Sequence, residues 1–158
     1  GKRKTTLGVN ITLHSTHGDL SREMFMDGLG GGYSVRGWRI ETRELFKDEK
    51  QPYRFGFYSA VSSLELRQTV IPRFSIEQPT PFGPVKSALG LQAVLFIDGG
   101  VAGDNWNDLT ETSPMFGVGL GVRIPVALAG NMRLDYGWSF YEGAVVESAF
   151  HLAVGQKF

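Results

Sequence analysis

The sequence contains no cysteine, so it excludes disulfide bonds and thiolate metal sites. It also lacks any run of the ~18 apolar residues that a transmembrane helix requires. Its 16 basic and 16 acidic residues balance, which argues against a nucleic-acid partner, because such a partner needs a basic excess. No signal-peptide pattern opens the chain. We therefore expect either a mature form or, preferably, a piece of a longer protein.

The dominant pattern is an alternation of apolar with polar or small residues, which predicts strands with two different faces. Phe116, Val118 and Leu120, for example, alternate with Gly117 and Gly119. The same period covers six segments, at about 5–15, 57–70, 88–98, 115–126, 132–141 and 149–158. These segments approach the ~9–11 residues with which a tilted strand crosses a bilayer.

The polar faces of these segments carry charged side chains, as a solvated barrel lumen would. A soluble β-sandwich also alternates, although its strands are usually ~5–6 residues long. The pattern therefore favours an all-β fold, an antiparallel transmembrane β-barrel portion, over the sandwich that it leaves open.

The connections between the segments are unequal in length. We expect a tight turn at 126–131, longer loops at 99–114 and 142–148, and one very long loop at 16–56. Outer-membrane barrels have short periplasmic turns and long extracellular loops. This rule predicts the outer membrane of a Gram-negative bacterium and a periplasmic C-terminus. The segment 71–87 would then be a long periplasmic turn, because its prolines exclude central-strand pairing there.

Six strands do not close a barrel, which needs about eight or more. An open sheet edge in lipid leaves unpaired backbone groups, each costing several kcal/mol. We therefore expect the missing strands to come from a parent chain or from another copy of this chain, with outer-membrane lipid around the barrel.

Several short motifs follow one another along the chain. They are Val35-Arg36-Gly37-Trp38, then Phe96-Ile97-Asp98-Gly99, then the glycine-rich segment 117–123, and a last segment that ends on Phe158. In this order and spacing the set resembles the C-terminal barrel of the BamA/TamA/Sam50/Toc75 superfamily of outer-membrane insertases and transporters, also called the bacterial surface antigen family.

The resemblance implies one long extracellular loop that folds inward and meets the barrel wall. Arg36, flanked by Val35, Gly37 and Trp38, would pair with Asp98 and Glu65, near Phe96 and Gly99. The alternation independently places Glu65 and Asp98 on the polar faces of their strands. The last strand would form one lip of the barrel seam and carry the C-terminal signal at Phe150, Leu152, Val154 and Phe158.

By the same resemblance the chain is not an enzyme. It would be the C-terminal barrel segment of an assembly, insertion or translocation factor for nascent outer-membrane proteins, and it would template an incoming strand at the seam. One alternative is a membrane anchor for a secreted passenger, such as a patatin-like lipase. Another is a small self-associating barrel.

Three local patterns suggest ligand sites, but each has a plainer interpretation. The glycines at 28–32 lack the strand–loop–helix context of a phosphate loop. The acidic stretch 104–108 lacks the central glycine and distal glutamate of a calcium loop. The three histidines have no metal-ligand spacing, and no serine has a matched His/Asp arrangement. We expect no catalytic residue, no metal and no cofactor, and we expect the glycines of 117–121 to form a smooth luminal wall.

Overall fold

The computed structural model describes residues 4–17, 27–39, 54–80, 83–126 and 130–155. Most of them form one antiparallel sheet of six strands in the order β1-β4-β5-β6-β7-β8. The six are β1 (Thr5–Ser15), β4 (Tyr58–Thr80), β5 (Gly83–Gly103), β6 (Met115–Val126), β7 (Gly130–Tyr141) and β8 (Ala144–Val154).

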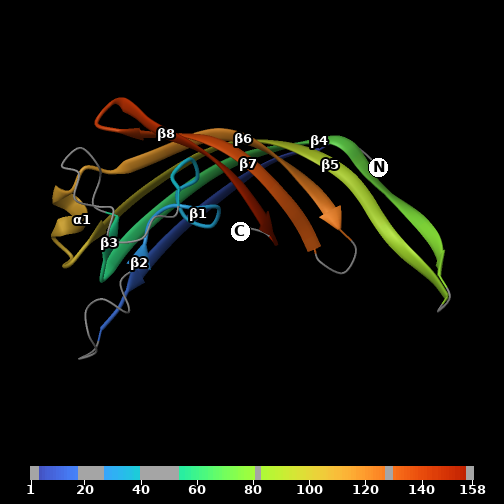
Figure 1. Ribbon diagram of the computed structural model, residues 1–158, viewed down its shortest axis with the longest axis horizontal. Helices are drawn as coiled ribbons and strands as arrows, with labels where there is room; N and C mark the ends of the chain where they lie inside the picture. Colours follow the sequence, from blue (N-terminus) through green and yellow to red (C-terminus); the bar gives the residue numbers. More distant parts are fainter. Residues whose placement is uncertain (1–3, 18–26, 40–53, 81–82, 127–129, 156–158) are drawn as a thin grey trace.

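A short pair of strands, β2 (Asp27–Gly28) with β3 (Phe55–Gly56), and a one-turn helix, α1 (Asp108–Glu111), complete the described elements. Figure 1 shows the sheet as a single curved layer, with β2, β3 and the loop that follows β2 beneath its concave side. Among the described residues, no helix is long and apolar enough to span a membrane.

The two faces of the sheet are inverted relative to a soluble protein. Side chains such as Ile11, at 72% exposure, and Phe150, at 63%, project from the outer face, whereas Glu65 and Asp98 are fully buried on the inner face. The outward set includes Leu7, Val9, Leu13, Leu64, Leu66, Leu95, Ile97, Phe116, Val118, Leu120, Leu152 and Val154. An exposed apolar face opposite a polar interior is the pattern of a membrane barrel. The predicted all-β barrel portion is confirmed, and the sandwich is excluded.

The segment 71–87 is not the long turn that we predicted. β4 and β5 continue to pair there as far as Thr80 and Gly83, which makes a two-stranded ribbon beyond the rest of the sheet. The pairing of β1 with β4 stops at Gln68, and the pairing of β6 with β5 stops at Gln92. Both ribbon strands therefore have an open edge beyond these residues. Proline is tolerated on such edges and at bulges, because its missing N–H is not needed there. The expectation was wrong because it assumed a central strand.

The predicted loop at 142–148 was also wrong. β8 begins at Ala144, after a two-residue turn in which Glu142 has a φ of 49° and Gly143 a φ of 81°. The pairing with β7 shifts by one residue between Trp138 and Phe140. This β-bulge breaks the alternation that would have revealed the strand, because an extra residue reverses the faces. Residues 127–129 of the predicted tight turn lie outside the described residues, although Val126 and Gly130 are paired at its base.

Candidate functional site

The loop after β2 is a compact structure that enters the concave side of the sheet. The Leu29 N–H donates to the Arg54 carbonyl at 2.8 Å, and the Gly31 N–H donates to the Trp38 carbonyl at 2.9 Å, so both ends of the loop are tied. Gly37 has a φ of 95°, in the left-handed region that glycine adopts without steric cost. These constraints present residues 33–37 to the inner wall.

Arg36 lies at the tip of this loop, and its side chain is fully buried between two wall carboxylates. Its Nε and Nη2 donate to the two oxygens of Asp98 at 2.7 and 2.9 Å, and its Nη1 donates to Glu65 Oε2 at 2.6 Å. The backbone N–H of Arg36 also donates to Asp98 Oδ2 at 3.0 Å. The bidentate, charge-assisted pairing fixes both position and orientation. The structure thus brings together the three charged residues that the sequence singled out.

Phe96 forms the floor beneath this guanidinium. Its ring centroid lies 3.7 Å from Cζ of Arg36, within the range of a cation–π contact. Burial alone would lower the pKa of Arg36, but the hydrogen bonds and charge of Asp98, helped by Glu65, raise this pKa above its usual value. The loop arginine therefore stays charged.

The charged network continues across the inner wall beyond the residues that the sequence predicted. Glu65 also accepts from Arg67 at 2.6 Å and from Arg123 at 2.9 Å. Asp135 accepts from Arg123 at 2.6 Å and from Arg133 at 3.2 Å. The sequence pattern predicted that the charged faces of these strands line a solvated lumen, but Arg123, Arg133 and Asp135, which lie on those faces, are all buried. That expectation was wrong because the loop covers the wall, and strand alternation alone carries no sign of this cover.

Glycines allow the loop to approach the wall this closely. A Cβ atom at Gly117 would lie 1.7 Å from the carbonyl oxygen of Arg36 in the loop. One at Gly119 would lie 2.5 Å from Cζ of Phe96, the wall residue on which the Arg36 guanidinium rests. The predicted smooth wall of β6 is therefore confirmed. Gly99 packs beside the Phe116 ring rather than against the loop, whereas a Cβ at its neighbour Gly100 would lie 2.6 Å from Val35.

Val35 and Trp38 anchor the loop on either side of its arginine. Both are fully buried in an apolar cluster that consists of Leu29, Val35, Trp38, Ala102 and Met115. The Trp38 indole N–H donates to the Phe116 carbonyl at 2.8 Å, and the Arg54 guanidinium lies 4.4 Å from the Trp38 ring. Apolar anchoring on both flanks holds the charged tip in place.

A sequence model of the Omp85 superfamily domain matches residues 23–158, which is most of the chain. The chain belongs to the Omp85 superfamily. A search of curated proteins and a search of solved structures each return no match. Omp85 proteins insert or transport proteins at the outer membrane, and the superfamily is one of insertases and transporters rather than of enzymes.

The last strand of this Omp85 domain touches the loop at several points. The Gly37 N–H donates to His151 Nε2 at 3.0 Å, the Tyr33 hydroxyl donates to the Val154 carbonyl at 2.6 Å, and the Arg39 N–H donates to Glu147 Oε1 at 2.9 Å. The sequence did not single out Tyr33 or His151, because no spacing rule links them before the fold is known.

The structure describes three of the four apolar residues that were predicted for the last strand. Phe150, Leu152 and Val154 project from the outer face of β8, each more than half exposed. Phe158 lies outside the described residues.

No group of three or more His, Asp or Glu side chains suited to a metal ion occurs among the described residues. The stretch 104–108 has a structural role instead, since Asp108 Oδ2 accepts the N–H groups of Asp104 and Asn105 at 2.9 and 3.1 Å.

Proposed function

We propose that this chain forms the C-terminal wall of an Omp85 barrel and that β8 offers its open edge to an incoming strand of a client outer-membrane protein. One observation carries the proposal. In the described part of the chain, β8 pairs with β7 on one side only, and the loop contacts it from the lumen. An open strand edge is a row of unpaired donors and acceptors that binds another strand.

The backbone directions in β8 support pairing of such a strand at its open edge. The Gly155 N–H donates to the Asn131 carbonyl at 2.7 Å, so Gly155 points toward β7. Backbone groups alternate in direction along an antiparallel strand, and those of Val154 therefore point away from β7. The carbonyl that Tyr33 caps is thus one that a paired strand would use.

The lengths of the connections support one orientation of the chain in the membrane. The charged loop, which belongs to the connection between β1 and β4, lies at the same end of the sheet as the connection that contains α1. Long connections are extracellular in such barrels, and the C-terminus is then periplasmic. Barrel closure uses further strands, from a parent chain or a second copy, since a free edge is costly in lipid.

Cysteine crosslinking tests the templating role cleanly, because the chain has no native cysteine. Leu152→Cys on β8 would be paired with single cysteines placed along the last strand of a stalled β-barrel substrate. We expect disulfides in one antiparallel register, since templating fixes the alignment of the two strands. Leu66→Cys on β4 is the matched control, because this leucine has the same outward direction but its strand has two neighbours. Equal crosslinking at both positions, or none at β8, contradicts the proposal.

A further inference from the structure

A second polar feature of the inner wall lies away from the loop arginine, at the base of the β4–β5 ribbon. A cavity of about 440 Å³ opens there, where β4 loses its pairing with β1, β5 loses its pairing with β6, and the ribbon continues. Its lining includes three basic residues and no acidic one, and consists of Lys4, Thr69, Ile71, Pro72, Arg73, Gly90, Leu91, Gln92, Arg123, Pro125 and Asn131.

The sheet register explains why donor groups gather in this cavity. Thr69 is opposite Gln92, and Gln92 is opposite Arg123, so the three form one row across β4, β5 and β6. Residues in one row share a face of the sheet. The hydroxyl, the amide and the guanidinium can each donate a hydrogen bond.

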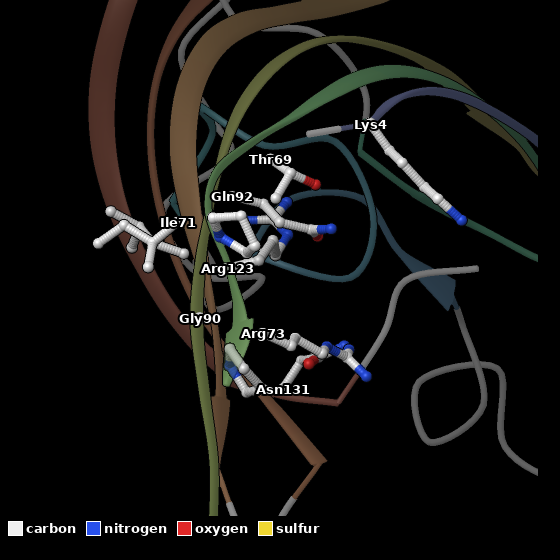
Figure 2. A pocket seen from close by; sticks show the side chains of 11 residues that line it. Lys4, Thr69, Ile71, Arg73, Gly90, Gln92, Arg123 and Asn131 are labelled. Atoms are coloured by element: carbon white, nitrogen blue, oxygen red, sulfur yellow. The ribbon is translucent and has the colours of Figure 1, made fainter. Parts of the chain in front are cut away.

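Two irregularities in β4 bring a further arginine into the cavity. The pairing shifts between Thr69 and Ile71 and again between Ile71 and Phe74, so Pro72 and Arg73 together face Gly90. Such bulges re-aim side chains and are frequent beside functional sites. Figure 2 shows Arg73, Asn131 and Lys4 extending to the same side of the ribbon, while Ile71 points to the opposite side.

The donor groups of this region are only partly satisfied by the described residues. The Nε of Arg123 is buried and has no hydrogen-bond partner in the described structure, although its Nη atoms bind Glu65 and Asp135. Lys4 and Arg73 form no side-chain ion pair with the described residues. A buried unsatisfied donor costs free energy unless a ligand or water binds it.

We infer that this cavity is a binding site for a phosphate group. Lys4 and Arg73 would bind its oxygens as cations, while Gln92 and Asn131 would donate neutral hydrogen bonds. A tetrahedral anion with several acceptor oxygens matches a cavity to which several strands contribute donors, and arginine binds phosphate in a bidentate manner. The cavity also has apolar lining from Leu91 and Pro125, so the phosphate could belong to a small soluble anion or to a phospholipid head group.

The inference is tested with the full-length protein in a neutral detergent, by calorimetric titration with inorganic pyrophosphate. We expect saturable binding that weakens as salt rises, because the contacts are ionic. Arg73→Gln should weaken it about tenfold or more, the loss expected when charge-assisted bonds are removed. Arg73 is exposed in the ribbon, so this variant should fold. Lys4→Gln, at a second exposed position, should also weaken binding.

Arg39→Gln is the matched control, since it removes one positive charge from the loop, away from the cavity. It should leave pyrophosphate binding unchanged. A second arm adds phosphatidylglycerol to the detergent: competition with pyrophosphate identifies a lipid head group as the ligand, and lack of competition identifies a soluble phosphate. The inference is overturned if the unaltered protein binds neither probe saturably, or if Arg73→Gln and Lys4→Gln bind like Arg39→Gln. It does not depend on strand templating at β8.

Discussion

Removing the loop arginine tests the buried charge network most directly. In Arg36→Ala the side-chain bonds to both oxygens of Asp98 and to Glu65 are lost, while the backbone bond to Asp98 can remain. All three side chains are fully buried. Breaking a buried ion pair by removing one partner costs about 3–5 kcal/mol, because the remaining charge is poorly solvated. We expect a loss of that size in the free energy of unfolding.

The two carboxylates should not contribute equally to this loss. Glu65 keeps Arg67 and Arg123 as charged partners when Arg36 is removed. Asp98, by contrast, loses the cation that binds both of its oxygens. Neutralising Asp98 should therefore relieve much of the penalty, so Arg36→Ala with Asp98→Asn should be more stable than Arg36→Ala alone. Arg36→Ala with Glu65→Gln should be less stable than Arg36→Ala, because Arg67 and Arg123 would then both lose the charge of Glu65, although Arg123 keeps its bond to Asp135.

The assay is urea unfolding in detergent, followed by tryptophan fluorescence and by heat-modified mobility on gels. A double-mutant cycle isolates the coupling between each pair from the effects of the single changes. The reasoning would be refuted by an Arg36→Ala variant within about 0.5 kcal/mol of the unaltered protein, which is the range of ordinary surface substitutions. Equal rescue by Asp98→Asn and Glu65→Gln would refute the assignment of the penalty to Asp98.

Three further changes have defined outcomes. Gly117→Ala should displace the loop from the wall, because the new Cβ would meet the Arg36 carbonyl at 1.7 Å, and limited proteolysis should then cut the loop faster. Trp38→Phe should lower the free energy of unfolding by about 1–3 kcal/mol, since the part-buried hydrogen bond from the indole N–H to the Phe116 carbonyl is lost, and urea unfolding measures this. Tyr33→Phe should leave global stability within about 1 kcal/mol but speed hydrogen exchange in β8, as the Val154 carbonyl loses its cap; unchanged exchange would contradict that role.

The strands could be predicted from the sequence because alternate residues face lipid and the lumen, and the two environments favour different side chains. Leu7 to Leu13 in β1 and Phe116 to Leu120 in β6 show this period without interruption, and the structure exposes their apolar side chains on one face. The motif around Arg36 was readable for a different reason, since its spacing to Asp98 resembles a family pattern. Both signals are local in sequence and need no knowledge of the neighbouring strand.

The features that were missed depend on what lies beside each segment. The ribbon beyond Thr69 was rejected because of its prolines, which are acceptable only because β1 and β6 end before it. The start of β8 was missed because of a bulge opposite Ser139, whose hydroxyl bonds to both the N–H and the carbonyl of Glu147. Burial of Arg133 depends on the loop, whose Gly32 carbonyl it binds at 2.8 Å. The neighbours of a strand, and the loop that buries its side chains, cannot be deduced from the sequence of that strand alone.

The loop is held to the wall and to the last strand by contacts of very different strength. Its Arg36 side chain is ion-paired and fully buried against β4 and β5, at a cost of about 3–5 kcal/mol if broken. Its contacts with β8 are single hydrogen bonds to His151, Val154 and Glu147, each worth about 0.5–1.5 kcal/mol, and an exposed ion pair of Arg39 with Glu147 that is worth little. β8 can therefore separate from the loop while the loop stays fixed to the central wall. That order of strengths agrees with the templating role that we propose for β8, because a strand that pairs with the open edge would displace only the Tyr33 bond to the Val154 carbonyl.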